Sequence, residues 1–258
     1  MNQMTYAQTM NQMAELKLTG MLNAYRDITD DPDWTEQGFE DKLAYLVDQE
    51  YQRRRDNRIL SRIKEAKFKD QAHLHELIYT QDRNLSKDLV HRFATHRWID
   101  NHENIIITGA TGTGKSYLAQ ALGDHACRHG YRVQYYRLPD LLNELYFKRQ
   151  TDRYLRMRQA LQRRNLLILD DWGMATLDVL AGHEIAQIVE DRLGNRSTIV
   201  ISQFPVNTWD RIFEDKTTAD AVMDRLVHVA YTIELQGPSL RARAASRELQ
   251  EYKEAMLE

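Results

Sequence analysis

The chain has 258 residues, 42% of them apolar and 28% charged, and its formal net charge of −3 argues neither for nor against binding to nucleic acid. This is the composition of an ordinary soluble globular protein. The lone Cys127 excludes an internal disulfide framework and a multi-cysteine zinc site. No apolar stretch is long enough to span a membrane, and the polar start MNQMTYAQTMNQM lacks the order of a signal peptide, so we expect a cytoplasmic protein.

The first 75 residues are predicted to form a small helical domain. MAELKLTGMLNAYRDI carries apolar residues at helical spacing, and a break at Asp30–Asp33 separates it from a second helix through FEDKLAYLVDQEYQRRRDNRILSRIKEAK. Residues 76–103 are predicted to connect this domain to the next one and contain a short amphipathic piece, KDLVHRFATHRWI. Residues 104–258 then form the second domain.

From residue 104 onward, short apolar segments alternate with helical sequence. Because near-continuous apolar strands that alternate with helices indicate a parallel sheet covered on both faces, we expect an α/β fold. The predicted strands are 104–108, 132–137, 166–170, 198–202 and 230–235.

A glycine-rich segment between the first strand and the next helix matches the phosphate-loop pattern G-x-x-x-x-G-K-[ST] at every fixed position. The glycines allow the backbone to curl so that its N–H groups point at phosphate oxygens, and the helix that follows adds its positive N-terminal end. The alternative is a glycine-rich turn that binds nothing. The predicted ATP-binding residues here are Gly109, Ala110, Thr111, Gly112, Thr113, Gly114, Lys115, Ser116 and Tyr117.

Four side chains are predicted to act on the phosphates, the metal ion and the attacking water. Lys115 would reach the β- and γ-phosphates, and the Ser116 hydroxyl would ligate Mg²⁺. The buried strand LLILDD ends in two acids whose side chains point to opposite faces, so Asp170 is predicted to hold Mg²⁺ and Asp171 to orient or deprotonate the water. A plain surface turn is the alternative for the two acids.

The strand TIVIS ends in polar residues, at the edge of the sheet where ligands bind in folds of this kind. Ser202 or Gln203 could therefore reach the γ-phosphate or the water, and the alternative role of Gln203 is to cap a loop.

Several segments together resemble the family of IstB insertion-sequence helper ATPases. They are GATGTGKSYLAQALG, LLILDDWG, VISQFPVNTWDRIFED, AVMDRLVH and IELQGPSLR, and the N-terminal LKLTGMLNAYRD and FEDKLAYLVDQEYQRRRDNR extend the resemblance over nearly the whole chain. These are AAA+ proteins related to the DnaC helicase loader. The resemblance implies an AAA+ ATPase that uses ATP and Mg²⁺.

The same resemblance implies roles for two arginines. Arg225 stands at the family's arginine-finger position and would act on ATP held by the adjacent subunit, whereas without the family it reads as a salt-bridge partner on an amphipathic helix. Arg241, in GPSLR, would contact nucleotide in its own subunit or lie at the interface.

Three positions depart from what the resemblance implies. Gln203 replaces the asparagine common among relatives, and Leu240 replaces the usual tyrosine. Asp171 replaces the glutamate general among AAA+ ATPases, at a position where this family often has aspartate. The shorter acid suggests slow turnover. Only 23 residues follow Leu235, too few for a full helical lid, so we expect a neighbouring subunit to close the site.

Two basic segments are predicted to bind double-stranded DNA without sequence preference. Residues 53–69 and 148–164 each carry a net charge of +6 in a net-negative chain and have helical periodicity, although a solvated helix face is the usual meaning of such a run. By the resemblance, the second segment stands where initiator and loader proteins carry an extra helix that faces DNA. The predicted contact residues are Arg53, Arg54, Arg55, Arg58, Arg62, Lys64, Lys148, Arg149, Arg153 and Arg156.

Taken together, the residues and the resemblance predict an ATPase that self-assembles on duplex DNA and assists a transposase. The closest alternative is a helicase loader of the DnaC kind, in which residues 1–75 would bind a helicase instead. Two more distant interpretations are a small-molecule kinase and a DNA-binding structural protein in which ATP only sets the assembly state.

Overall fold

The strands that carry the candidate site residues lie in one parallel sheet. The computed structural model describes residues 6–228, 230–240 and 242, and in this part of the chain the strand order is β2-β3-β4-β1-β5. Each neighbouring pair is parallel, as in the match of Ile106 on β1 to Val200 on β4. The bounds are β1 Asn104–Gly109, β2 Val133–Arg137, β3 Leu166–Trp172, β4 Ser197–Ser202 and β5 Ala230–Leu235.

The predicted α/β fold is confirmed. The strand positions differ from the predicted ones by no more than two residues at either end, because uninterrupted apolar runs such as Leu166–Leu169 leave little choice of register. Those four residues are fully buried, as expected when helices cover both faces of a sheet.

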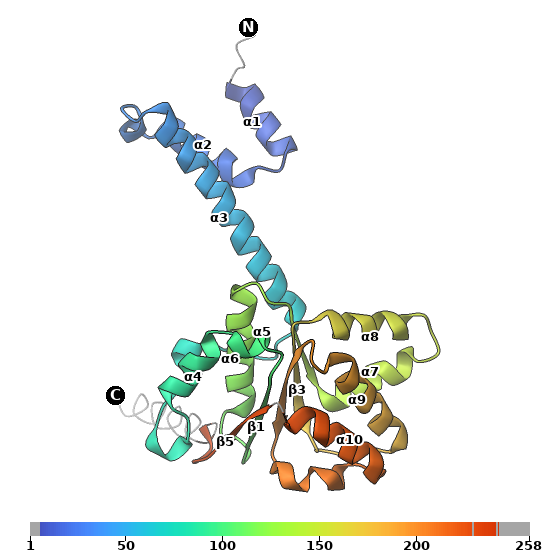
Figure 1. Ribbon diagram of the computed structural model, residues 1–258. Helices are drawn as coiled ribbons and strands as arrows, with labels where there is room; N and C mark the ends of the chain where they lie inside the picture. Colours follow the sequence, from blue (N-terminus) through green and yellow to red (C-terminus); the bar gives the residue numbers. More distant parts are fainter. Residues whose placement is uncertain (1–5, 229, 241, 243–258) are drawn as a thin grey trace, which may run out of the picture. The chain divides into compact units, whose positions relative to one another are not determined.

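Helices pack on the two faces of the sheet in two groups (Figure 1). The first group lies on one face and consists of α4, α5 and α6, with α6 at its centre. The second group lies on the other face and consists of α7, α8, α9 and α10. The bounds are α4 Lys87–Ala94, α5 Arg97–Asp100, α6 Lys115–Arg128, α7 Leu138–Lys148, α8 Arg153–Arg163, α9 Val179–Arg192 and α10 Lys216–Val227, with 3-10 turns η2 Leu74–Glu76, η3 Gln81–Arg83 and η4 Val206–Ile212.

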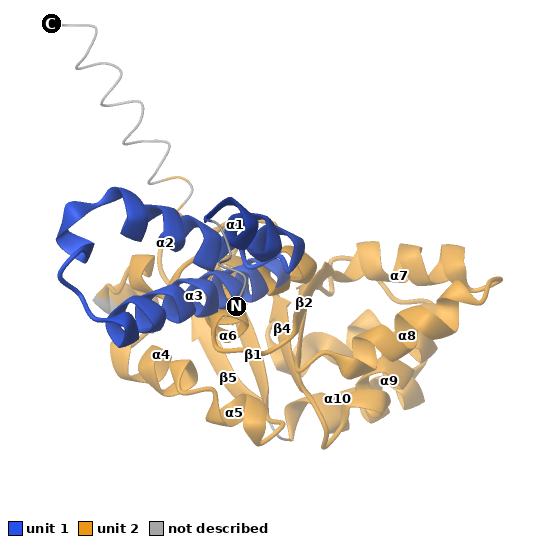
Figure 2. Cartoon of the chain, turned by 90° about the horizontal axis from the view of Figure 1, so that it is seen from above, with its two compact units in different colours: residues 1–61 blue, residues 62–258 orange. Residues whose placement is uncertain are grey.

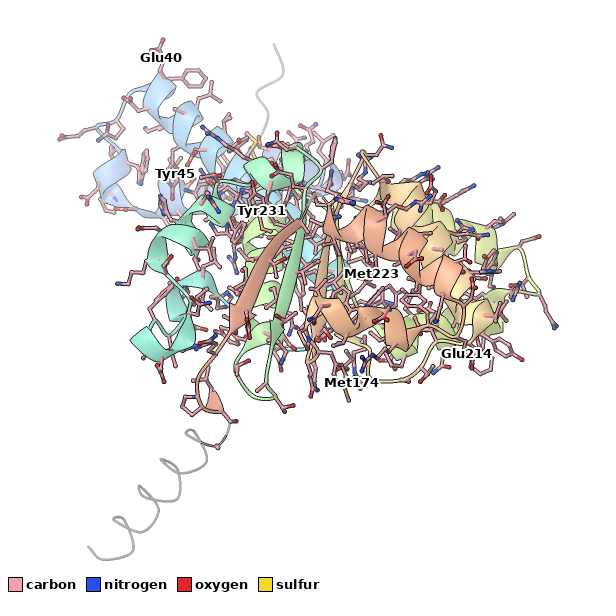
Figure 3. All side chains as sticks on the ribbon, turned by 60° about the horizontal axis from the view of Figure 1, so that its bottom comes forward. Glu40, Tyr45, Met174, Glu214, Met223 and Tyr231 are labelled. Atoms are coloured by element: carbon pink, nitrogen blue, oxygen red, sulfur yellow. The ribbon has the colours of Figure 1, made fainter. Side chains whose placement is uncertain are left out.

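Each face of the sheet has its own hydrophobic core. Tyr231 on β5 packs against the first core and Met223 on α10 against the second; both side chains are labelled in Figure 3. Residues 76–103, predicted as a connecting segment, supply Leu77, Phe93 and Trp98 to the first core. This segment is therefore packed into the unit that contains the sheet.

Side-chain caps fix where several of these helices begin. The Ser86 Oγ accepts a hydrogen bond from Leu89 N at 3.1 Å at the start of α4. Asp178 and Asp215 accept backbone N–H groups in the same way at α9 and α10. Each cap satisfies donors that a helix leaves unpaired in its first turn, and so defines the entry of the chain into the helix.

The chain divides into two compact units, residues 1–61 and residues 62–258, coloured separately in Figure 2. The division falls within α3, whereas the sequence pattern places a domain boundary at residue 75, and that boundary stays a prediction. Among the described residues, no helix has the length and apolar character needed to cross a membrane. The first unit contains α1 Tyr6–Glu15, α2 Thr19–Asp30, η1 Pro32–Trp34 and most of α3 Phe39–Ala66.

The first predicted helix of this unit is in fact two helices. Lys17 adopts a left-handed backbone conformation with φ 58°, and Leu18 N donates a 2.8 Å hydrogen bond to Met13 O. With the bond from Lys17 N to Ala14 O, this is the pairing that ends a helix in a Schellman motif. Helical spacing runs through this break, so the apolar pattern alone does not reveal it.

A buried carboxylate joins α2 to α3 within this unit. Glu50 Oε2 accepts a 2.7 Å hydrogen bond from Gly20 N in the first turn of α2. A Cβ on Gly20 would lie 2.7 Å from Gln49 O, so only glycine allows α2 to approach α3 this closely. Hydrogen bonds from Arg53, together with those from Arg54 and Gly20, lower the pKa of Glu50 to about 2 against the cost of burial.

Candidate functional site

The phosphate loop runs from the end of β1 to the start of α6, as its sequence predicts. Gly114 has φ 89° and forms the N-terminal boundary of α6, in a backbone region that favours glycine. A Cβ on Gly109 would lie 2.1 Å from Leu235 O, so glycine is also required where the loop leaves β1 beside β5. The loop therefore has the curled backbone that a phosphate cradle needs.

The Lys115 side chain lies inside this loop. Its Nζ donates hydrogen bonds to Gly109 O at 2.7 Å and Ala110 O at 2.8 Å, and the residue is buried. Thr113 Oγ1 also donates to Ala110 O, at 2.9 Å. The ammonium group is therefore held at the concave side of the loop, where phosphate oxygens would replace the backbone carbonyls as its partners.

A hollow of about 340 Å³ opens beside the loop, and segments before and after the loop contribute to it. Gln120 of α6 holds one wall in place, since its Oε1 accepts hydrogen bonds from Lys69 N at 2.7 Å and Asp70 N at 2.9 Å. Leu240 N donates a 2.9 Å hydrogen bond to Gly112 O. The lining residues are Lys69, Asp70, Gly112, Gly114, Lys115, Ser116, Tyr117 and Leu240.

Sequence patterns did not single out two contributors to this region. Arg83, buried in η3, donates a 2.6 Å hydrogen bond to Thr113 O and so braces the loop from outside. Asp70 lines the hollow itself. Neither belongs to a recognisable motif, because each reaches the loop only through the folding of residues 67–86 against α6.

The two acids at the end of β3 have different surroundings. Asp170 is buried, and its Oδ2 accepts a 2.8 Å hydrogen bond from the Tyr135 hydroxyl. Burial, together with the nearby Asp170 carboxylate, raises the pKa of Tyr135, so the phenol stays protonated and donates. Asp171 has φ 59°, and its N–H donates to Asp170 Oδ1 at 2.8 Å.

Asp171 is paired with an arginine on the neighbouring strand. Arg137, the last residue of β2, donates from Nε to Asp171 Oδ2 at 2.5 Å, and this bond raises the pKa of the guanidinium. Arg137 could have been identified in the sequence because it stands at the carboxyl end of a predicted strand, and that strand neighbours β3. The pairing places a positive charge beside the carboxylate predicted to act on water.

Gln203 follows β4 and contacts the phosphate loop directly. Its Oε1 accepts a 2.7 Å hydrogen bond from Thr111 Oγ1, and its Nε2 lies 3.3 Å from Met174 Sδ. The structure thus brings Gln203 to the loop, at the same edge of the sheet as Asp170 and Asp171, which follows from the parallel strand order.

The donor set at this edge suits Mg²⁺. Ser116 stands in the first turn of α6 and lines the hollow, and Asp170 supplies carboxylate oxygens held by Tyr135 and by the Asp171 amide. Hydroxyl and carboxylate oxygens are the ligands that Mg²⁺ prefers, together with phosphate oxygens of the substrate. These two residues are therefore the ones that would hold the ion.

Arg225 lies at the opposite edge of the sheet from the phosphate loop. It is near the end of α10, where the Asn104 amide at the start of β1 donates to Leu226 O at 3.3 Å. Arg225 donates from Nε to Glu190 Oε2 and from Nη1 to Ala221 O at 2.8 Å. The length of β1 separates Arg225 from the phosphate loop of its own chain. Arg241 lies outside the described residues.

The predicted DNA contacts on α3 fall into two groups. Arg53 and Arg54 both donate to Glu50, at 2.8 and 2.6 Å, so they help to hold the buried carboxylate. Arg55 and Lys64 are exposed, as is Arg58, which donates to the Arg54 carbonyl at 3.1 Å. Arg62 is half-buried and belongs to the second compact unit.

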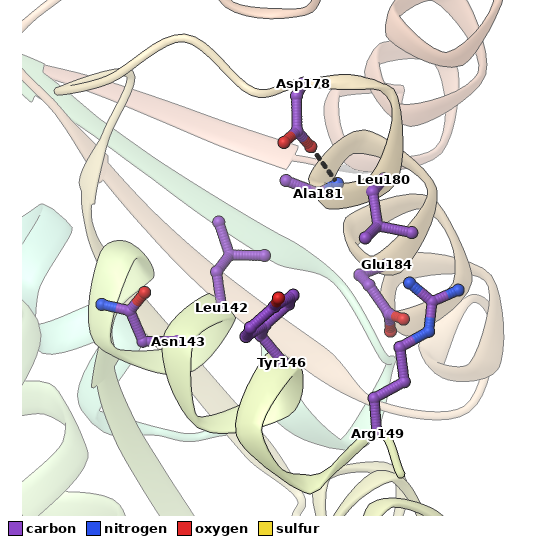
Figure 4. A pocket seen from close by; sticks show the side chains of 8 residues that line it. All are labelled: Leu142, Asn143, Tyr146, Arg149, Asp178, Leu180, Ala181 and Glu184. Carbon is purple, nitrogen blue, oxygen red and sulfur yellow. Dashed lines mark hydrogen bonds between the residues drawn. The ribbon is translucent and has the colours of Figure 1, made fainter.

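The second basic segment is not one continuous helix. Lys148 ends α7, where it pairs with Glu144, and α8 begins only at Arg153, so Arg149 stands in the turn between them. Arg153 and Arg156 are exposed on α8. Arg149 also lines a pocket of about 220 Å³ between α7 and α9, where its side chain points toward Glu184 (Figure 4).

Comparison with known proteins identifies the family. The family model described as IstB-like ATP binding protein matches residues 11–248. The chain belongs to this family. It is 40% identical over 233 residues to the insertion sequence ATP-binding protein y4pL of Sinorhizobium fredii, covering 90% of this chain and 95% of that protein. A second member, the ATP-binding protein of insertion sequence IS1162 from Pseudomonas fluorescens, is 38% identical over 78% of this chain and 87% of its own length.

Solved structures confirm the AAA+ fold of this family member. The AMPPCP-bound DnaA from Aquifex aeolicus has a TM-score of 0.57 at 21% identity, over 72% of this chain and 56% of that one. The DnaC helicase loader has a TM-score of 0.53 at 16% identity, over 68% and 99% of the two chains. At these identities the similarity concerns the fold.

Proposed function

We propose that this protein hydrolyses ATP and, through ATP binding, self-assembles on duplex DNA to assist a transposase. The observation that carries the proposal is the gathering of Lys115, Asp170, Asp171 and Gln203 at one edge of the sheet, in a member of a family named for ATP binding in insertion sequences.

In this proposal each residue at the edge has one task toward ATP. Lys115 binds the β- and γ-phosphates, and Gln203 orients the γ-phosphate or the water from its place beside Thr111. Asp171 accepts the proton of the attacking water once its carboxylate is free of Arg137. Mg²⁺, held by Ser116 and Asp170, would neutralise charge on the phosphates.

A second copy of the chain completes the site. The length of β1 separates Arg225 from the phosphate loop of its own chain. Arg225 can therefore serve as an arginine finger only for ATP bound to a neighbouring copy. At an interface the Arg225 guanidinium would leave Glu190 and stabilise the negative charge that develops on the transferring phosphoryl group. An arginine in this role greatly increases the rate of phosphoryl transfer in related enzymes. Assembly and hydrolysis are then coupled, as the resemblance to the family implies.

The exposed arginines on α3 and α8 support contact with the phosphate backbone of duplex DNA. Neither helix has the residue order of a base-reading motif, so binding would be largely independent of sequence and sensitive to salt. The transposase partner follows from the names of the relatives, which are proteins of insertion sequences. The similarity of fold to the DnaC loader keeps a helicase as the second candidate partner.

The test measures ATP hydrolysis and particle size in ATP and in ADP, each with and without duplex DNA. We expect large particles and faster hydrolysis only with ATP and DNA together, with Lys115→Ala as the variant that loses both. A protein that hydrolyses ATP at full rate as a monomer on DNA contradicts the proposal. Pull-down with the transposase and with a hexameric replicative helicase then separates the two candidate partners.

A further inference from the structure

Three histidines from two separate segments meet on the face of the sheet covered by α6. His96 precedes α5, His125 lies in the last turn of α6, and His129 follows that helix. One ring nitrogen from each lies within 4.8 Å of the others, and the His125 Nδ1 to His96 Nε2 distance is 3.0 Å. His125 and His96 can share a hydrogen bond at this distance, and three imidazole nitrogens gathered this closely also offer lone pairs in the arrangement that metal ions bind in proteins.

The backbone around these residues holds the rings in place. His96 is buried and has a left-handed backbone conformation with φ 60°. His125 and His129 are four residues apart and so project from the same side of the helix end. The Nδ1 of His129 lies 2.8 Å from His125 O, which fixes its proton on Nδ1 and leaves Nε2 as a lone-pair donor.

Burial and close approach disfavour a charge on two of the three rings, His96 and His125. Burial, followed by the neighbouring His125 and His129, lowers the pKa of His96 to about 4, and burial also lowers the pKa of His125. The nearby Asp100 carboxylate is already bound by the Tyr131 hydroxyl at 2.8 Å. Neutral imidazole is the form of histidine that binds metal.

We propose that His96, His125 and His129 bind one divalent transition-metal ion, with Zn²⁺ the natural choice. Imidazole nitrogen suits Zn²⁺, Cu²⁺ and Ni²⁺ and is a poor ligand for Mg²⁺, so this site is chemically separate from Ser116 and Asp170. Zn²⁺ with nitrogen at about 2.0–2.1 Å needs ligand atoms about 3.4 Å apart, and the observed spacing, 3.0 Å between His125 Nδ1 and His96 Nε2 and within 4.8 Å for the three residues, lies on either side of this value. A water molecule is the natural fourth ligand.

The site would join two elements of the ATPase unit. Metal binding would fasten the segment before α5 to the C-terminal end of α6, the helix that begins at Lys115. Because an ion that binds only the folded state stabilises it, the proposal predicts a higher melting temperature with Zn²⁺. It does not depend on what the protein does with ATP or DNA.

The test uses the full chain without a polyhistidine tag, stripped with a chelator and then dialysed. ZnCl₂ is titrated by calorimetry in the presence of excess Mg²⁺, and Co²⁺ is used as a spectroscopic probe whose visible absorption reports tetrahedral nitrogen ligation. We expect one ion per chain, bound at micromolar or lower concentration, and a rise in melting temperature. His129→Gln is the main variant because this exposed residue can be replaced without disturbing the core.

We expect His129→Gln and His125→Gln to lower Zn²⁺ affinity at least tenfold and to lose the Co²⁺ absorption, while ATP binding stays unchanged. The matched control is His183→Gln, which removes an exposed histidine from α9 and should bind Zn²⁺ like the wild type. Equal affinity in His129→Gln and the wild type overturns the proposal, as does the absence of binding in the wild type.

Discussion

Arg137 and Asp171 form an ion pair across the ends of two neighbouring strands, with 2.5 Å between Nε and Oδ2. Asp171 is the carboxylate proposed to accept a proton from water, and one of its two oxygens is occupied by the Arg137 guanidinium. The pair therefore offers a physical means to keep hydrolysis slow until the strand ends rearrange. Arg137 would act through Asp171, as a positioning residue.

Replacing Arg137 by alanine should raise ATP hydrolysis in the absence of DNA severalfold, because Asp171 is released from its partner. The factor by which DNA stimulates hydrolysis should fall by a similar amount, because the DNA-bound protein gains less from the loss of Arg137. Steady-state phosphate release with and without duplex DNA measures both. Arg132→Ala, at an arginine just before β2, is the matched control, and a fall of the DNA-free rate in Arg137→Ala would count against this role.

Mixing two inactive variants tests the role of Arg225. Lys115→Ala should lose nucleotide binding, and Arg225→Ala should bind ATP but lose hydrolysis by a factor of about 10³. When the two proteins are mixed, some interfaces pair an intact phosphate loop with an intact Arg225, so part of the activity should return. Hydrolysis is measured over a range of mixing ratios.

The matched control for Arg225 is Arg211→Ala, an exposed arginine in η4 that is not expected to alter the rate. If Arg225→Ala alone hydrolyses ATP at the wild-type rate, Arg225 is only the partner of Glu190. No recovery at any mixing ratio would mean that the two residues do not act across an interface.

The strands and the phosphate loop were predictable because each depends on neighbours in sequence. The run Leu166–Leu169 has to be buried on both faces, and the loop needs its glycines at fixed spacing. The break at Lys17 was missed because it follows from the contact of Gly20 with α3, which a periodic pattern does not contain. The helix pattern in residues 148–164 likewise concealed the turn at Arg149.

The contacts that the sequence did not predict, at the candidate ATP site and in the histidine cluster, join segments that are far apart in the chain. Arg137 lies 34 positions from Asp171, and His96 lies 29 positions from His125. Nothing in the local pattern of either residue predicts its partner, because the partner is set by strand order and by helix packing. The sequence therefore predicts the phosphate cradle well and the groups that surround it poorly.

Arg192 should be important for stability although, among the described residues, no acid is paired with it. Its buried guanidinium donates to Leu161 O at 2.6 Å, Ser197 O at 2.5 Å and Thr198 Oγ1 at 3.1 Å, and burial lowers its pKa. Arg192→Met would leave these acceptors without a donor, at a cost of about 3 kcal/mol in the free energy of unfolding. Urea unfolding measures the loss; Arg163→Met is the exposed control, and equal midpoints would refute the prediction.

Glu50 should stabilise the N-terminal unit in a pH-dependent way. Because its folded pKa is about 2, below the usual value of 4.5, its contribution is complete above pH 4.5 and is lost as the pH falls from there toward 2. Glu50→Gln should therefore speed hydrogen exchange of α2 amides at neutral pH by removing about 1–2 kcal/mol of stability. The difference from wild type should vanish near pH 2.

The control for Glu50 is Asp48→Asn, an exposed acid on the same helix. Its α2 amides should exchange at the wild-type rate at every pH, after correction for the intrinsic pH dependence. A Glu50→Gln protein with the same α2 protection as the wild type at neutral pH would show that the bond to Gly20 contributes nothing net.

The arginines on α3 should separate into a DNA-binding group and a structural group. Arg55 and Arg58 are exposed, so Arg55→Ala and Arg58→Ala should each weaken binding to any duplex and reduce the log–log salt slope by about 1, from about −5 in the wild type. Arg54→Ala should act differently, because Arg54 is bound to Glu50, which in turn holds α2. This substitution should loosen α2 and should change the salt slope less than Arg55→Ala or Arg58→Ala does. Fluorescence anisotropy with two unrelated duplexes, over a range of salt concentrations, measures the slope. Equal slopes in Arg55→Ala, Arg58→Ala and the wild type would remove these two arginines from the DNA interface and leave Lys64 of α3 and the exposed Arg153 and Arg156 of α8 as the basic residues to test next.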